Sequence, residues 1–236
     1  MRILLALAIG VAAVSSPAIA VPSNAAATNE DARFTAFGER IVDEFLKLDP
    51  VSATQLGDHR YDALLPDVSA KGRAARRAFA GQALAQLAKF DAHRLSREHQ
   101  VDAILLRDQL NYIIFSVDRL QDWAWDPLTY SAGNAFFTLT SREFAPLPVR
   151  LRSAIGRMEA LPTFLQQARE SLNPARVPLI HAQTAAKQNP GLNDLIDGIV
   201  AQKSALPAAD QTRLVKAAAT AKAAVADYQE WLDKQL

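Results

Sequence analysis

Apolar residues recur at helical spacing along most of the chain from Glu30 onward. The first series falls at positions i, i+3, i+7, i+11 and i+14, a spacing that places every member on one face of an α-helix. We therefore predict an amphipathic helix whose apolar face enters a core. Its members are Phe34, Phe37, Ile41, Phe45 and Leu48.

Similar patterns, bounded by prolines and by capping residues, continue to the end of the sequence. Asp49, Ser69 and Ser96 carry side chains that cap helix amino termini, and Gly57 suits a carboxy-terminal cap. No alternating run with a hairpin signal is found. The pattern predicts an all-α fold: one domain over residues 30–236, with about nine or ten helices joined by short loops. The further helices are expected over 50–57, 69–90, 96–120, 131–144, 148–161, 162–172, 176–188, 192–204 and 207–236.

The predicted helix that follows Ser96 has apolar residues around much of its circumference. A helix that is apolar on all sides is normally buried. We expect this helix to run through the middle of the domain. The residues concerned are Leu106, Leu110, Ile113, Ile114, Val117 and Leu120.

The first twenty residues have the order of an export signal. A basic start at Arg2 precedes an apolar run over 3–14, and residues 15–20 end in Ala-Ile-Ala, a typical cleavage sequence. The run is shorter than the roughly 20 residues needed to span a bilayer. We predict a signal peptide over 1–20, a flexible leader over 21–29, and a periplasmic or secreted product without a membrane span.

Composition narrows the classes of function. Lys and Arg number 26 and Asp and Glu 25, and no basic cluster occurs beyond Arg73, Arg76 and Arg77, which argues against a nucleic-acid partner. The absence of cysteine excludes disulfides, Cys-ligated zinc and a thiol nucleophile in this chain.

The residues of a complete active site are also missing. The four histidines include no His-Glu-x-x-His pair and none spaced four apart, and the glycines form no phosphate-binding loop. A zinc site needs three or four ligands that converge on one point. We therefore predict no catalytic residue, no metal ligand and no cofactor in this chain.

One polar loop remains as a candidate site. Asp58, His59 and Tyr61 follow the predicted helix end at Gly57, and His59 could act there as an acid or base. The alternative is structural: a helix cap at Gly57 followed by Asp–Arg pairs that hold the turn.

Two further features also allow two interpretations. Trp123 and Trp125 lie between Asp122 and Asp126, which fits either a sugar-stacking platform or packing at an interhelical corner. Arg142 could hold a substrate carboxylate in a bidentate manner, or form an ion pair within the chain.

The order of several short motifs resembles the amino-terminal half of the bacterial family named Domain of Unknown Function 885. The resemblance extends from about Phe34 to Leu236. The motifs are Asp49-Pro50 with the segment 54–62, Leu65-Pro66-Asp67, Trp125-Asp126-Pro127 with Tyr130, Phe144-Ala145-Pro146 with Arg150, Arg157 with Pro162 and Phe164-Leu165, Ala168-Arg169 with Leu172, and Pro174 with Val177.

This resemblance implies a secreted, helical relative of zinc metallopeptidases of the gluzincin type. In that family the zinc signature, a His-Glu pair followed by Pro-Gly-His-His, lies in the carboxy-terminal half, and it does not occur here. No zinc ligand is therefore carried over, and zinc is expected only in a full-length relative. The implied role is one wall of a substrate cleft, with Tyr130 and Arg142 as lining residues.

The last helix keeps its periodicity up to Leu236, without a cap. We interpret this as a truncated protein whose carboxy-terminal half, or a partner chain that supplies it, is missing. Self-association through an exposed patch around Val225, Trp231 and Leu232 is then expected. A frayed natural terminus, and a free-standing exported binding module without catalysis, are the alternatives.

Overall fold

The computed structural model describes residues 29–236, and in this part of the chain it contains helices and no strand. The all-α prediction is confirmed. The predicted signal peptide and residues 21–28 of the predicted leader lie outside the described residues. The helices are α1 (Asn29–Leu48), α2 (Pro50–Leu56), α3 (Ala70–Leu87), α4 (Arg97–Phe115), α5 (Asp122–Trp125), α6 (Gly133–Ser141), α7 (Leu147–Ser171), α8 (Leu179–Gln188), α9 (Gly191–Ala201) and α10 (Ala208–Gln235).

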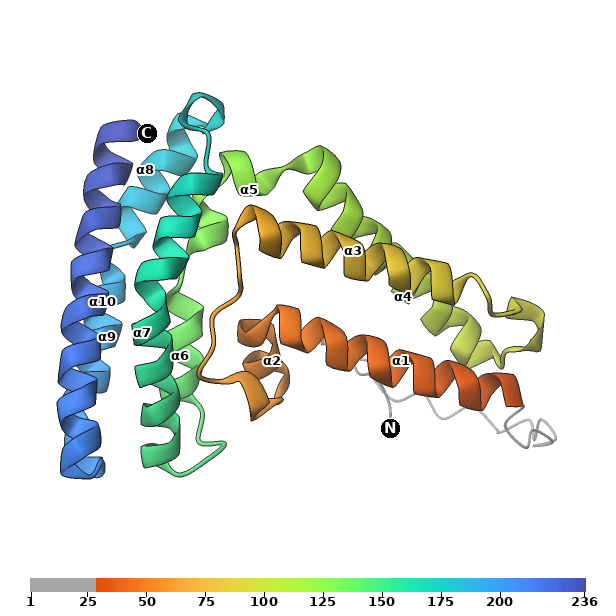
Figure 1. Cartoon of the computed structure of the whole chain (residues 1–236), viewed down its shortest axis with the longest axis horizontal. Coiled ribbons are helices and arrows are strands. Elements are labelled where there is room, and N and C mark those ends of the chain that lie inside the picture. Colours follow the sequence, from red (N-terminus) through yellow and green to blue (C-terminus); the bar gives the residue numbers. More distant parts are fainter. Residues whose placement is uncertain (1–28) are drawn as a thin grey trace, which may run out of the picture.

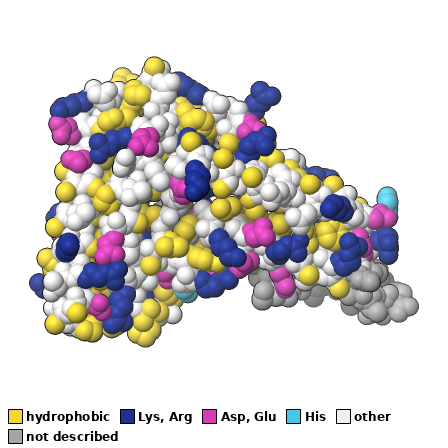
Figure 2. Space-filling model, in the orientation of Figure 1, with side chains coloured by type: hydrophobic (Ala, Val, Ile, Leu, Met, Phe, Trp, Pro, Cys, Tyr) yellow, Lys and Arg dark blue, Asp and Glu magenta, His cyan; other side chains and the backbone are white. Residues whose placement is uncertain are grey.

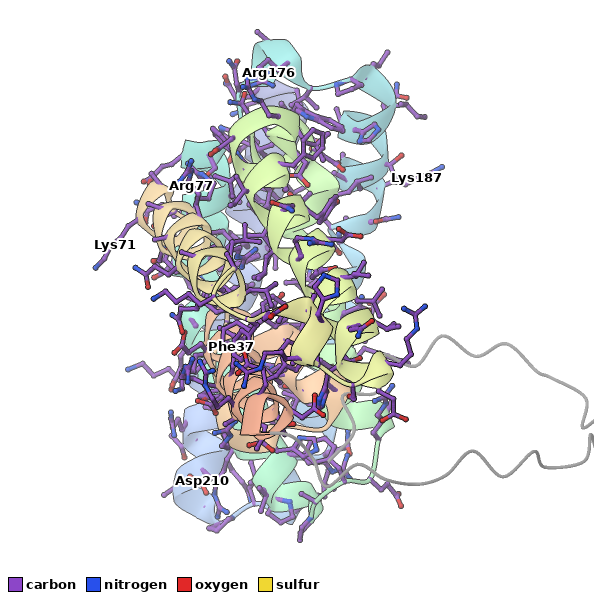
Figure 3. All side chains as sticks on the ribbon, turned by 90° about the vertical axis from the view of Figure 1, so that its right-hand side faces the viewer. Phe37, Lys71, Arg77, Arg176, Lys187 and Asp210 are labelled. Atoms are coloured by element: carbon purple, nitrogen blue, oxygen red, sulfur yellow. The ribbon has the colours of Figure 1, made fainter. Side chains whose placement is uncertain are left out.

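The helices form two groups with separate apolar clusters (Figure 1). The arm consists of α1, α3 and α4, and its core contains Phe34, Phe37 and Ile41 from the predicted first stripe. Figure 3 shows Phe37 among the helices of the arm. The body consists of α6 to α10, in which α7 packs along α10. The short helices α2 and α5 lie where the two groups meet.

The predicted break at Pro162 is wrong, because α7 continues through this residue. Proline lacks the backbone N–H that would bond to the preceding turn, and it normally ends or kinks a helix. Here Leu161 and Leu165 on either side are both buried in the body core. Burial of the same helical face before and after Pro162 keeps the two halves in register.

The expectation for α4 is also wrong. Only Leu110 and Ile113 of this helix are buried, and they face the core of the arm. Helix α4 therefore lies at the surface and not in the middle of the domain. Ala103, Leu106 and Ile114 also pack against that core. The remaining large apolar residues of α4 form a second face, which is described with the candidate site below.

The predicted patch on the last helix is not exposed as expected. Val225 and Leu232 are buried in the body core, and Trp231 is half-buried with its ring stacked on Tyr228 at 5.9 Å. The reason is that α7 covers this face of α10. Leu232 cannot contribute to self-association while the helix is packed in this way.

A carboxylate ties the start of α1 to the start of α4. Asp31 Oδ1 accepts hydrogen bonds from the backbone N–H of Ser96 at 2.8 Å and from Nδ1 of His99 at 2.9 Å. The hydrogen bond from His99, followed by that from Ser96, holds the pKa of Asp31 below its ordinary value. A carboxyl group whose pKa is lowered on folding stabilises the protein above its unfolded pKa, and this contribution is lost as the pH falls through the folded pKa.

We expect Asp31→Asn to lower the free energy of unfolding at pH 7, and the difference from wild type to shrink as the pH falls below about 4. Urea unfolding between pH 2.5 and 7 measures this. Asp227→Asn, on the exposed side of α10, is the control and should show no such pattern. If the difference in unfolding free energy between wild type and Asp31→Asn stays constant down to pH 2.5, the charge of the Asp31 carboxylate is not its cause.

Candidate functional site

The polar loop after α2 is held by its own side chains. Gly57 ends α2 with φ of +91°, a conformation that glycine adopts without strain. Asp58 accepts from the backbone N–H of Arg60, whose guanidinium contacts Asp58 and Asp43 of α1, each at 2.6 Å. These contacts agree with the structural interpretation of the loop.

His59 is part of the same arrangement. Its Nδ1 lies 3.0 Å from Oδ2 of Asp62, and its ring lies flat on that of Phe144, with centroids 3.7 Å apart. The other oxygen of Asp62 accepts from the Thr54 hydroxyl at 2.6 Å. Asp62 therefore fixes the edge of the imidazole, and Phe144 covers its face. The second contact links the loop to the segment after α6.

The loop rests on a fully buried arginine of α7, Arg157. Its Nε donates to the carbonyl oxygen of Leu64 at 3.1 Å, its Nη1 to that of Ala135 in α6, and its Nη2 to the hydroxyl of Thr54 at 2.6 Å. Burial lowers the pKa of Arg157 to about 10, against the opposite effect of the nearby Asp62 and Asp49. One guanidinium therefore joins α2, the following loop, α6 and α7.

A neighbouring glycine lets the loop come this close. An added Cβ at Gly156 would lie 2.8 Å from the Cβ and the carbonyl oxygen of Ala63. Any side chain there would push the loop away from α7 and separate Leu64 from Arg157.

The structure separates the two predicted cleft residues. Tyr130 precedes α6 and Arg142 follows it, so they lie at opposite ends of this helix. The guanidinium of Arg142 donates to the carbonyl oxygen of Gln55 at 3.0 Å, beside the loop that contains His59. Arg142, Asp58, His59 and Tyr61 thus belong to one corner of the molecule, whereas Tyr130 does not.

Tyr130 lines a pocket of about 180 Å³ between α6, α8, α9 and α10. It is only 4% exposed, and its hydroxyl donates to the carbonyl oxygen of Trp123 at 2.6 Å. Tyr228 lines the same pocket; burial raises the pKa of its hydroxyl, which has no hydrogen-bond partner within the described part of the chain. The lining contains no charged residue, so the pocket lacks the ligands that zinc requires.

The contacts of Trp123 and Trp125 support the packing interpretation of these residues. Trp123 Nε1 donates to the carbonyl oxygen of Val117 at 3.1 Å, and Trp125 Nε1 to that of Leu120 at 2.9 Å. The guanidinium of Arg73 lies 4.1 Å from the centroid of the Trp123 ring. Both indoles therefore join α5 to the segment Ser116–Leu120 that follows α4.

The histidines do not converge on one point. His59, His99 and His181 each lie beside a different carboxylate, those of Asp62, Asp31 and Asp126. Within residues 29–236, no group of three or more His, Cys, Asp or Glu could hold a metal ion. In the same range, no helix is long and apolar enough to cross a membrane.

The feature that sequence reasoning missed is an exposed apolar stripe on α4. At about 100° per residue, its five members fall within an arc of about 100°, on the side of the helix opposite to Leu110 and Ile113. They extend over about 21 Å of the helix axis. We call this set the α4 stripe: Val101 (41% exposed), Ile104 (47%), Leu105 (62%), Tyr112 (54%) and Phe115 (49%).

A signal for this stripe was present in the sequence. Apolar residues all around α4 indicated burial, but Arg107 and Asn111 on one side of the helix, and Asp102 and Gln109 on the other, interrupt the pattern. They divide the circumference into two apolar faces, of which the arm covers one. A helix with two opposite apolar faces is typical of an element between two layers.

Comparisons with known proteins agree with this architecture. The model of a family described as "Bacterial protein of unknown function (DUF885)" matches residues 50–236. The chain belongs to this family. No curated protein matches it.

One solved structure is similar over most of the chain. It is described as a "putative lipoprotein of unknown function" from Shewanella oneidensis, with 28% sequence identity and a TM-score of 0.81. The match covers 86% of this chain but 37% of the Shewanella chain. The DUF885 fold described here thus occurs within a much longer polypeptide.

Proposed function

We propose that this DUF885 chain is the amino-terminal helical part of an exported, zinc-metallopeptidase-like protein, in which it forms one wall of a substrate cleft. The observation that carries the proposal is the Shewanella structure, where a closely similar fold makes up 37% of the chain. The larger remainder of such a protein is where the catalytic groups would lie, as the sequence resemblance implies.

The corner between α2 and α6 is the proposed part of this wall that meets substrate. Arg142 and His59 are exposed there, and Tyr61 is half-buried in the same corner. A guanidinium that already donates to a backbone carbonyl at 3.0 Å keeps further N–H groups for a carboxylate. The buried network of Arg157, Thr54 and Asp62 keeps this corner rigid.

The alternative, a free-standing exported binding module, predicts a surface without large apolar patches. The α4 stripe argues against it, because five large apolar side chains are exposed on one face of that helix, and exposed apolar patches mark interaction sites. The face shown in Figure 2 has basic and acidic side chains interspersed, so it offers no single-sign surface for a charged polymer.

We expect the purified chain alone to hold well under one zinc ion per molecule and to hydrolyse no peptide. Zinc needs three or four converging ligands, and the described histidines are dispersed. Elemental analysis and a peptidase assay measure both quantities. One tightly held zinc per chain would contradict the proposal that catalysis resides elsewhere.

We also expect export with cleavage after Ala20. Mass spectrometry of the envelope fraction should find a mature amino terminus at Val21. An intact Met1 in that fraction would contradict the assignment of residues 1–20, which lie outside the described structure.

A further inference from the structure

We propose that the α4 stripe is the surface on which the rest of the longer protein packs, through an apolar face that carries a Lys or Arg opposite Asp108. The inference rests on the proposed function, since it identifies the partner and the place of contact. The partner is the carboxy-terminal part of the family fold, either on the same polypeptide or on a separate chain.

The first argument is the burial pattern of α4. Leu110 and Ile113 already supply the contact with α1 and α3, so the opposite stripe contributes nothing to the arm. Five large side chains aligned over about 21 Å match the length of a helix–helix contact. An isolated exposed apolar residue needs no explanation, but several aligned on one face of a helix indicate an interface.

The position of α4 supports the same conclusion. In Figure 3, α3 lies on the left of the molecule, and α4 and α8 lie to its right. Helix α8 starts with Leu179 and Ile180, which are among the most exposed large apolar residues of the described chain. The arm and the body thus each carry exposed apolar side chains, on α4 and on α8, that one large partner would cover.

The length of the Shewanella chain supports a partner of this kind. This chain matches 37% of it, so most of that polypeptide must pack outside the shared fold. A remainder of that size is large enough to form a substantial contact with the shared fold.

Charge argues against a second copy of this chain as the partner. Asp108 is exposed and lies within the arc of the α4 stripe. A twofold axis that joins two stripes near their middle brings two Asp108 carboxylates together, and like charges facing across an apolar contact are unfavourable. A partner other than a second copy can instead place a Lys or Arg side chain opposite Asp108.

Site-specific photo-crosslinking tests this inference. p-Benzoylphenylalanine replaces Leu105 or Tyr112 in the chain produced in its own bacterium, and intact cells are irradiated. The control position is Val215 on α10, an apolar residue with comparable exposure. We expect Leu105 and Tyr112 to cross-link, at least about tenfold more than Val215, to peptides from the carboxy-terminal part of the family fold.

A charge reversal adds a second readout. Asp108→Arg should reduce the cross-link from Tyr112 by about fivefold or more and leave the melting temperature unchanged, since Asp108 is exposed. Asp227→Arg on α10 is the matched control. Cross-links between two copies, cross-links to lipid, or equal yields from Val215 would overturn the inference.

The outcomes also separate the inference from the proposed function. Cross-links to the carboxy-terminal part from Phe137 or Leu179, with none from Leu105 or Tyr112, would refute the α4 interface and leave the proposed function standing. No cross-link to that part from any of these exposed positions would refute both.

Discussion

Arg157→Met should lower the free energy of unfolding by about 3–5 kcal/mol, the range found when one partner of a buried polar network is removed. Methionine fills similar space but donates no hydrogen bond to the carbonyl oxygens of Leu64 and Ala135 or to the Thr54 hydroxyl, and the bonds to Ala135 and Thr54 are buried. It also leaves Asp62 buried without its cationic neighbour.

Arg152→Met is the matched control on the same helix. Its guanidinium contacts Asp210 at 2.7 Å on the surface, and such pairs contribute about 0–1 kcal/mol. Guanidinium chloride unfolding of both variants measures the comparison. Equal losses of unfolding free energy in the two variants would mean that the buried contacts of the Arg157 guanidinium stabilise the fold no more than a surface ion pair does.

The second large effect is expected at Phe136. It is fully buried in the body core, whereas its neighbour Phe137 on the same helix is 55% exposed. Phe136→Ala should cost about 3–5 kcal/mol of stability through lost burial and a residual cavity. Phe137→Ala should change stability by less than about 0.5 kcal/mol. Thermal and urea unfolding test the pair, and a large loss at Phe137 would show that this face is covered in the isolated chain.

The helices α1 and α7 illustrate what sequence alone can and cannot predict. Periodicity identified most helices and their inner faces, because Phe34, Phe37 and Ile41 follow one spacing that only a helix satisfies. It could not predict that α7 continues through Pro162, because the packing that maintains the helix comes from residues distant in sequence.

The candidate site was predictable only in part. Gly57 and the Asp–Arg pairing followed from local spacing. The contacts of Arg157 with Pro50, Thr54 and Leu64 join residues about a hundred positions apart, and no local pattern encodes them. The α4 stripe was misinterpreted for a related reason. An apolar face that packs on the arm and an apolar face that stays exposed have the same pattern in sequence.

The central claim is that this chain functions as the amino-terminal part of a longer exported protein. The most direct test is the native mass of the protein isolated from the envelope of its bacterium, combined with peptide mapping. We predict an assembly or polypeptide that also contains the carboxy-terminal part of the DUF885 fold. A monomer that consists of this chain alone, stable and without associated protein, would contradict the account.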